Sequence, residues 1–431
     1  MIPHPAGLAL ALLLLAPVAS MAQPAGTTRH ALANGMRVLV REDAEAGVVA
    51  VSLQTLAGSR FEAPEIAGIT NFLHRAMLRG TSRHTAERLV EAAEDIGGAL
   101  DASADVDYSE VRGSALARHW ETLLGLIAEV ALTPTMPPDE VDKERRLILS
   151  QIQTRADNPF PAAFDVLLGE LYPAHPYSWP PVGRREAIAR VTRDALVAHH
   201  QSIYRPDRLV LAVSGRVEPR SVRRVAERLF GALPVGAPTP LPALPPPRPT
   251  EERRLLDRPA RQAQILIGYV ASGLAEADYA ATKVLGALLG GGMAGRLFVE
   301  LRDRLGLAYA VGVLSPTRAG PGPFVAYLGT ARENVAAAEA AVRRELDRVR
   351  AEGATEDEVA RAKAYVLGSL AMDRRSNARH AWYLAFFEVV GAGWDFPERH
   401  ARAIEAVTPA DVQAAARRHL TNPTTVVLQP R

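Results

Sequence analysis

The sequence has no cysteine and only three lysines among its 431 residues. The absence of cysteine excludes disulfides, thiol nucleophiles and thiolate metal ligands. A formal net charge of +2 argues against a dedicated nucleic-acid binder, because the many arginines are interleaved with Asp and Glu. Hydrophobic residues at 48 % and charged residues at 23 % are ordinary values for a folded soluble protein.

Long apolar runs are also scarce, and the one exception lies at the N-terminus. Residues 8–19 are apolar, and Ser20-Met21-Ala22 follows as an A-x-A-like cleavage site before Gln23. This pattern predicts a secretory signal peptide over residues 1–22 and therefore a periplasmic or otherwise exported protein. The alternative is a signal that is retained as an anchor. The run is too short to span a bilayer, and we expect no transmembrane segment after cleavage.

The chain length and one proline-rich stretch predict two domains. Residues 231–250 are rich in proline and read as a semi-rigid linker between residues 28–230 and 251–431. A helix, a loop with proline and an apolar strand follow Thr192, and the same order follows Thr408, 216 positions later. This long period predicts a duplicated α+β domain. Each copy is expected to be a mostly antiparallel sheet with helices covering one face.

Periodicity and turn residues place the elements of the first domain. Asn34-Gly35 predicts a hairpin turn between two short strands of residues 29–42. Further strands are expected at 48–56, 99–104 and 108–115, and helices at 85–96 and 117–131.

The stretch Gly68–Thr81 is the one around which the first domain is organised. It reads as a single helix closed by Gly80. Asn71, His74 and Arg75 are spaced so that their polar groups should share one helix face, which is how a helix presents metal ligands and a general base. The residue types are wrong for that task, because an amide, an imidazole and a guanidinium offer one good metal ligand between them.

This helix resembles the signature helix of the pitrilysin/insulinase family of zinc metallopeptidases, whose motif is H-x-x-E-H. In that register Asn71 and Arg75 stand at the two zinc histidines, and His74 stands at the general-base glutamate. The family's third ligand is a glutamate on a later helix that residues 144–151 resemble, and its position is Gln151. The resemblance therefore implies that the zinc site is lost and that this chain holds no metal.

A strand next to this helix resembles the family's substrate-pairing strand. Its small side chains would leave the backbone open to an extended peptide. The residues expected to contact peptide are Ala99, Leu100, Asp101, Ala102 and Ser103. The alternative is an ordinary solvent-facing edge.

One active-site feature of the family is retained in the second half. A glycine cluster, Gly290–Gly292, precedes a helix but lacks the Gly-Lys-Ser/Thr ending of a phosphate loop, so a flexible loop is expected. Arg302 and Tyr309 follow, seven positions apart. In the family an Arg and a Tyr at this spacing reach across to substrate at the zinc site, where a Tyr hydroxyl can donate to an oxyanion. The alternative is a solvated Arg and a core Tyr.

The resemblance implies a non-catalytic subunit that pairs with a homologous zinc-bearing subunit around an unfolded peptide. The zinc is then expected in the partner, and Arg302 and Tyr309 act on the partner's site. A second possibility is an inert peptide-binding or scaffold protein of the same fold. A third is an enzyme with an altered metal site built from Asn71, His74 and Gln151, although amides are poor zinc ligands.

Overall fold

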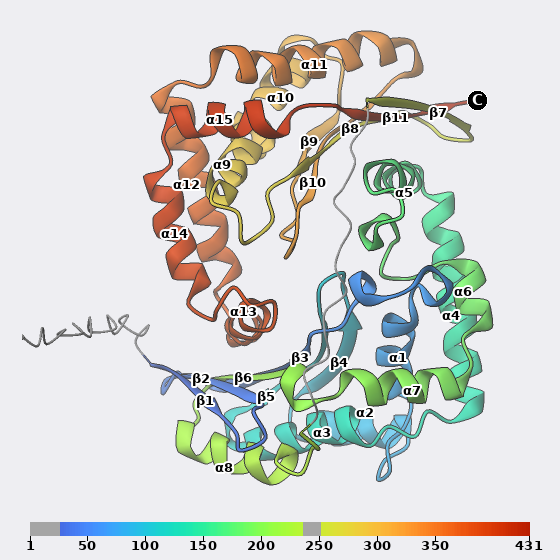
Figure 1. Ribbon diagram of the computed structural model, residues 1–431, viewed down its shortest axis with the longest axis vertical. Coiled ribbons are helices and arrows are strands. Elements are labelled where there is room, and N and C mark those ends of the chain that lie inside the picture. Colours follow the sequence, from blue (N-terminus) through green and yellow to red (C-terminus); the bar gives the residue numbers. More distant parts are fainter. Residues whose placement is uncertain (1–25, 236–250) are drawn as a thin grey trace, which may run out of the picture.

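The structure is a computed structural model that describes residues 26–235 and 251–431. The predicted signal peptide and most of the predicted linker lie outside these ranges and stay predictions. Within the described ranges the chain forms two α+β halves, one above the other in Figure 1. No helix in these ranges has the length and apolar character needed to cross a membrane.

The N-terminal half contains both strands and helices, as the sequence predicts. The strands are β1 (Thr27–Ala31), β2 (Arg37–Glu42), β3 (Val48–Thr55), β4 (Ala99–Ala104), β5 (Ser109–Leu116) and β6 (Leu209–Gly215). The helices are α1 (Ile69–Met77), α2 (Ala86–Asp95), α3 (Trp120–Leu132), α4 (Pro138–Asp157), α5 (Pro159–Leu171), α6 (Arg185–Arg190), α7 (Arg193–Ile203) and α8 (Pro219–Phe230).

The C-terminal half has a second set of the same kind. Its strands are β7 (Glu252–Arg258), β8 (Ala263–Ala271), β9 (Ala310–Leu314), β10 (Gly322–Thr330) and β11 (Thr424–Pro430). Its α-helices are α9 (Tyr279–Gly290), α10 (Arg296–Phe298), α11 (Val335–Glu352), α12 (Glu356–Asp373), α13 (Asn377–Val389), α14 (Phe396–Ala406) and α15 (Pro409–His419). A π-helix, η7 (Val299–Arg304), continues α10.

The two sheets have the same strand order, which confirms the duplicated α+β domain. The first sheet has the order β1-β2-β6-β3-β5-β4, and the second has the order β7-β11-β8-β10-β9. In the first, β2 and β6 are parallel and the other pairs are antiparallel. In the second, the corresponding pair β7 and β11 is parallel and the rest are antiparallel. Strand β1 is therefore the only addition to the first sheet among the described residues.

The internal repeat seen in the sequence is α7 and β6 in the first half and α15 and β11 in the second. Thr192 caps α7 by accepting from the Ala195 amide, and Thr408 caps α15 by accepting from the Asp411 amide. Each helix leads into a strand inside its sheet, β6 in the first half and β11 in the second.

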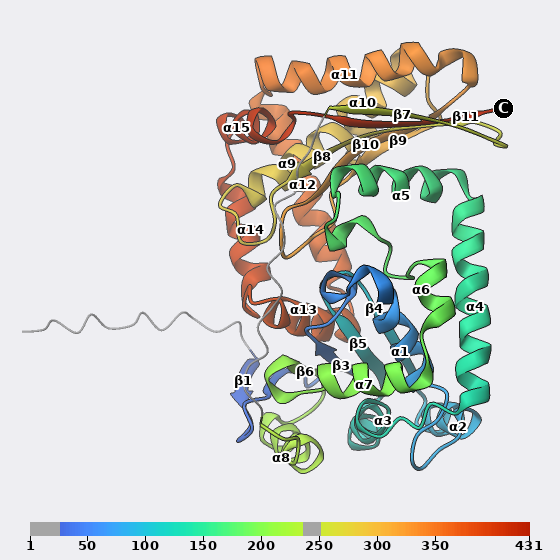
Figure 2. The ribbon, with the colours of Figure 1, turned by 45° about the vertical axis from the view of Figure 1, so that its right-hand side comes forward.

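Each half contributes one helix that packs on the sheet of the other half, an exchange that the sequence did not reveal. Helix α5 of the N-terminal half packs on β8 and β11 of the second sheet, and α13 of the C-terminal half packs on β3 and β6 of the first (Figure 2). The prediction of helices on one face holds for each half by itself. The second face of each sheet is covered by a helix from the other half, and the two halves share apolar core there.

An ion pair holds one of these exchanged helices in place. The carboxylate of Glu388, near the end of α13, accepts from Arg29 Nε at 3.0 Å and Arg29 Nη2 at 2.9 Å. Its backbone carbonyl accepts from Arg37 at 3.0 Å. Since Arg29 and Arg37 lie on β1 and β2, these contacts tie α13 to the outer strands of the first sheet.

Candidate functional site

Helix α1 is held at its N-terminus by a buried carboxylate. Glu62 accepts from the Gly68 amide at 2.6 Å and the Thr70 amide at 2.9 Å, which satisfies donors that a helix start leaves free. Burial raises the pKa of Glu62, and these hydrogen bonds oppose that rise. Gly68 has φ of 100° and a Cβ there would lie 2.4 Å from the Cα of Gly183, so only glycine fits this position.

Helix α1 is shorter than the sequence predicts, because it ends at Met77 rather than at Gly80. Gly80, with φ of 148°, instead forms a β-bridge with Thr85, and the chain turns there toward α2.

The guanidinium of Arg75 lies between α1 and α4, where the resemblance places zinc ligands. Its Nε donates to Glu144 Oε2 at 2.7 Å, and its Nη1 donates to Gln151 Oε1 at 2.9 Å. Arg79, which lies in the turn just beyond the end of α1, also pairs with Glu144. The Glu144 side chain is only 1 % exposed, so two arginines neutralise a buried carboxylate.

Asn71 and Arg75 face a pocket of about 510 Å³ between α1, α2 and β4. The Nδ2 of Asn71 is buried and has no hydrogen-bond partner among the described residues. The pocket is lined by Asn71, Arg75, Leu78, Arg79, Ala86, Leu89, Val90, Ala93, Glu94, Gly98, Ala99, Leu100, Asp101, Ala102 and Ser103.

His74 does not share this face, which corrects the prediction that the three polar groups point the same way. It is fully buried, and since a carbonyl oxygen can only accept, its Nδ1 donates to the Thr70 carbonyl at 2.8 Å. Its Nε2 then accepts from the Tyr204 hydroxyl at 3.0 Å. Burial lowers the pKa of His74 to about 4. Three residues of an α-helix turn about 300°, which leaves the side chains of positions 71 and 74 about 60° apart, and this separation places the imidazole in the core.

These residues do not fit a zinc ion. Arg75 puts a positive charge where the cation would be, and Gln151, the third ligand position, is bonded to it. Both ring nitrogens of His74 are already used inside the core, so the altered site of Asn71, His74 and Gln151 does not assemble either. In residues 26–235 and 251–431, no three His, Asp or Glu side chains group so that they could hold a metal.

Within the described ranges, strand β4 is the edge of its sheet and pairs only with β5. Ala99 and Asp101 are exposed, whereas Ala102 is buried toward the helices. Asp101 forms an ion pair with Arg112 of β5. The edge position agrees with the sequence analysis, and peptide binding by Ala99–Ser103 stays a prediction.

Arg302 and Tyr309 lie side by side in the C-terminal half. The Arg302 guanidinium is 4.7 Å from the ring centre of Phe298 and 5.2 Å from that of Tyr309, as in cation–π contacts. Tyr309 is 77 % exposed, so it is not a core residue. None of the residues lining the pocket at Asn71 comes from the C-terminal half, so one chain does not bring this pair to its own pocket.

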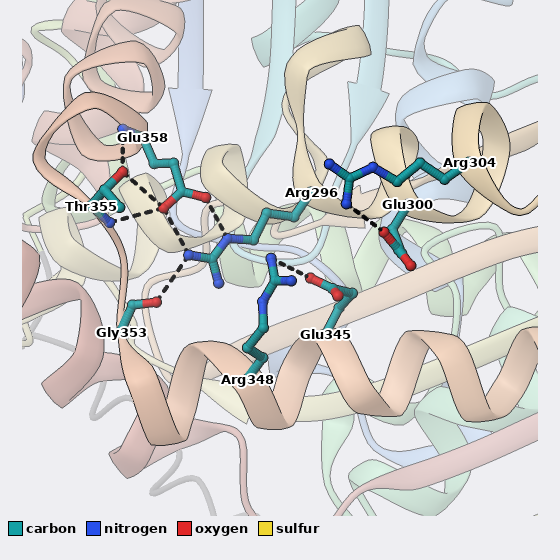
Figure 3. Close-up of polar contacts among 8 residues, drawn as sticks. All are labelled: Arg296, Glu300, Arg304, Glu345, Arg348, Gly353, Thr355 and Glu358. Atoms are coloured by element: carbon teal, nitrogen blue, oxygen red, sulfur yellow. Dashed lines mark hydrogen bonds and ion pairs between the residues drawn. The ribbon is translucent and has the colours of Figure 1, made fainter.

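A further ion pair anchors the segment that carries Arg302. Arg296, the first residue of α10, donates two hydrogen bonds to Glu358 of α12, at 2.7 and 2.8 Å, and one to the Gly353 carbonyl at 3.0 Å (Figure 3). Glu358 also completes the capping box of Thr355. The hydrogen bonds from Arg296 are the main reason that the pKa of Glu358 falls to about 2. This anchor lies directly after the glycine cluster Gly290–Gly292.

Sequence reasoning missed Glu144, Arg79 and Tyr204. A signal was present for Arg79, because positions 71, 75 and 79 follow one another at four-residue spacing and so form one ridge of a helix. The pairing of Arg79 with Glu144 had no such signal, since the two residues lie 65 positions apart.

The chain has two copies of one α+β domain, and helix α1 lies beside the edge strand β4. This arrangement defines the class of zinc-metallopeptidase-like chains. In this chain the ligand positions carry no zinc donors. Residues 37–180 match the model of the insulinase family (peptidase family M16), and residues 190–366 match the model described as the peptidase M16 inactive domain. The chain therefore belongs to the insulinase, or M16, peptidase family.

Individual relatives and solved structures agree with this assignment. An uncharacterized zinc protease of Rickettsia bellii is 26 % identical over 401 residues, covering 93 % of this chain and 96 % of the relative. The uncharacterized zinc protease YmxG of Bacillus subtilis is 27 % identical over 349 residues, covering 81 % and 84 %. A peptidase M16 inactive domain from Pseudomonas fluorescens has a TM-score of 0.87 at 24 % identity, covering 94 % of this chain and 98 % of that one. A protease from Helicobacter pylori has a TM-score of 0.86 at 20 % identity, covering 94 % and 99 %.

Proposed function

We propose that this protein is the non-catalytic subunit of a heterodimeric, exported zinc peptidase. Its partner is a homologous chain with an intact zinc site, and the substrate is an unfolded peptide enclosed between the two. The observation that carries the proposal is the contrast between the two halves. In the first half, Arg75 and Gln151 stand at two zinc-ligand positions and are joined by a hydrogen bond. The second half presents an exposed Tyr309 beside Arg302.

The exposed pair is suited to act on a site outside its own chain. A Tyr hydroxyl can donate to the oxyanion that forms when an amide is attacked, and a guanidinium can hold a substrate carbonyl. The contacts of Arg302 with the rings of Phe298 and Tyr309 restrict this side chain, which lowers the entropy lost when it binds. Within one chain this pair has no pocket of zinc ligands to serve, which supports its use in the partner's site.

In this proposal the chain's own edge strand β4 takes part in holding the peptide. An extended peptide can add to a free edge through main-chain hydrogen bonds, and β4 offers such an edge next to a pocket. Export follows from the predicted signal peptide over residues 1–22.

The alternative is an inert peptide-binding or scaffold protein of the same fold. The ion pair of Arg75, at a zinc-ligand position, with Glu144 also favours this alternative. The alternative gives Tyr309 no role. The test is to reconstitute the heterodimer with the partner and with the Tyr309→Phe variant of this chain. We expect assembly to be unchanged and peptide turnover to fall; unchanged turnover in an assembled, active complex would support the inert alternative.

A further inference from the structure

We propose that the pocket between α1, α2 and β4 selects extended peptides that carry acidic side chains at alternating positions. This inference rests on the proposed function, because it assumes that peptide pairs with the free edge of β4. It adds the chemical class of the peptide, which follows from the side chains that now stand at the former zinc positions.

The first argument is the row of donors that runs along α1 and into the turn just beyond its last residue, Met77. Asn71, Arg75 and Arg79 are spaced at four residues, and all three line the same pocket as the β4 residues 99–103. Arg75 and Arg79 side chains are 28 % and 38 % exposed, so they can be reached from the pocket. Within the described residues, Asn71 Nδ2 and Arg79 Nε are buried donors with no partner. A ligand that supplies acceptors would satisfy them.

The second argument is charge. Arg75 and Arg79 share one carboxylate, Glu144, so the ridge keeps an excess positive charge. Two other carboxylates line the pocket. Asp101 is paired with Arg112, and Glu94 is exposed on α2. A carboxylate of the ligand can therefore reach the arginines, which bind carboxylates well because of their planar, forked donors.

The third argument is spacing. Asn71 and Arg75 are four residues apart on α1, which is a rise of about 6 Å, and Arg79 follows four residues later in the turn after the helix. Two residues of an extended strand span about 6.6 Å. A peptide strand that is added to β4 therefore places every second side chain opposite a donor of α1. The remaining side chains point to the other side of the sheet.

The apolar part of the pocket favours glutamate over aspartate. Leu78, which caps the C-terminal end of α1, lies between the two arginines in the sequence, and Leu89, Val90 and Ala93 of α2 complete that wall. The methylene groups of a glutamate can pack on this wall while the carboxylate reaches a guanidinium, as long charged side chains commonly do.

The probe is a fluorescent peptide of about eight residues, long enough to pair along β4, in which Glu alternates with Thr. A matched peptide has Gln at every Glu position, and a third has Lys. Binding to the full mature chain is measured by fluorescence anisotropy at low and at physiological salt. We expect the Glu peptide to bind about tenfold more tightly than the Gln peptide, with a difference that shrinks as salt rises.

Variants of Arg79 assign that preference to the donor row. Arg79→Gln should remove most of the preference for Glu over Gln, whereas Arg79→Lys should keep most of it. Arg223→Gln is the matched control, because it makes the same change of net charge at an exposed position on α8, away from the pocket. Circular dichroism and the thermal midpoint show whether each variant is folded.

The outcomes separate this inference from the proposed function. Equal binding of the Glu and Gln peptides, with hydrogen-exchange protection of residues 99–104 in both complexes, overturns the acidic preference and leaves peptide binding intact. An equal loss in Arg79→Gln and Arg223→Gln also overturns it, since the effect would then be long-range charge. Binding of none of the three peptides contradicts both the inference and the peptide-binding part of the proposed function.

Discussion

Arg75 donates from Nη1 to the side-chain oxygen of Gln151 across 2.9 Å, and this hydrogen bond joins α1 to α4. By resemblance, both residues stand at zinc-ligand positions of the family. A guanidinium thus takes the cation's place and binds a neutral amide and the buried Glu144. A fixed positive charge repels a divalent cation. The substitutions therefore replace the zinc site with a different set of contacts, and do not merely lower its affinity for zinc.

The first prediction concerns metal content. The wild-type mature chain should hold no stoichiometric zinc after dialysis and should cleave no peptide by itself. The triple variant Asn71→His/Arg75→His/Gln151→Glu should bind zinc, because it restores three good ligands and leaves Glu144 paired with Arg79. Metal analysis of both proteins checks this. The triple variant should remain inactive, since His74 still occupies the position of the general base and is buried against Tyr204. Tightly held zinc in the wild type, with chelator-sensitive cleavage, would refute the prediction.

Much of this site could be predicted from the sequence, because helix periodicity determines which positions of α1 are neighbours. Asn71 and Arg75 were placed on one helix face in this way, whereas Gln151 was identified through the resemblance to the family. The orientation of His74 was not, because the choice between the pocket and the core depends on Tyr204, which lies 130 positions away. Ion pairs between distant elements, such as Arg79 with Glu144, are set by tertiary packing and leave no local pattern.

The dependence on tertiary packing also limits how much of the fold could be predicted from the sequence. Turn residues, caps and alternation predicted several strands and helices of the first domain, and the repeat that begins at Thr192 and Thr408 predicted the duplication. The exchange of α5 and α13 could not be predicted, because both have the apolar residues of an ordinary core helix. The sequence does not show which sheet such a helix will cover.

The second prediction tests the exchanged helix α13. Glu388→Gln should lower the free energy of unfolding by about 2 kcal/mol, because it removes a largely buried charge that pairs with Arg29 and Arg37. Denaturant titration measures the loss. The matched control is Glu91→Gln, since Glu91 forms an exposed pair with Arg88 and should change stability by at most about 0.5 kcal/mol. Equal effects would show that α13 is not held by Glu388.

The third prediction concerns pH. Burial is the main cause that lowers the pKa of His74 and His199 to about 4 in the folded chain, while an unfolded histidine titrates near 6.5. At pH values between these two pKa values, each histidine is protonated in the unfolded state but neutral in the folded state. Stability is therefore fully present above about pH 6.5 and falls as pH drops toward 4, by up to about 1.4 kcal/mol per pH unit for each histidine.

His199→Gln isolates one of these two contributions. Glutamine does not titrate but can still hydrogen-bond to the Thr70 hydroxyl, which His199 contacts at 3.0 Å. Between about pH 7 and pH 5 the wild type should lose about 2 kcal/mol more stability than the variant. The carboxylates common to both proteins cancel in this difference. Parallel pH profiles in denaturant titrations would contradict the assignment.

The fourth prediction concerns strand β4. A bound extended peptide should slow hydrogen exchange in residues 99–104, because new main-chain hydrogen bonds form at the free edge. Strand β1 lies at the opposite edge of the same sheet and serves as an internal control whose exchange should not change. Protection of both edges, or of neither, would argue against peptide pairing at β4.

The last prediction separates the roles of Tyr309 and Arg302 in the assembled heterodimer. The carbonyl of a bound peptide is a weak acceptor, whereas the tetrahedral oxyanion is charged and gains most from a placed donor. Tyr309→Phe should therefore lower kcat by on the order of 100-fold or more, or about 3 kcal/mol, with little change in KM. Phenylalanine keeps the ring over which Arg302 stacks, so assembly should be unaffected. Arg302→Ala should also raise KM, since it removes a contact made to the substrate before the reaction. Steady-state kinetics of the two reconstituted complexes supply both constants. If Tyr309→Phe changes KM and Arg302→Ala changes only kcat, the two roles are reversed. If neither constant changes in either variant, the pair contributes nothing to the partner's reaction.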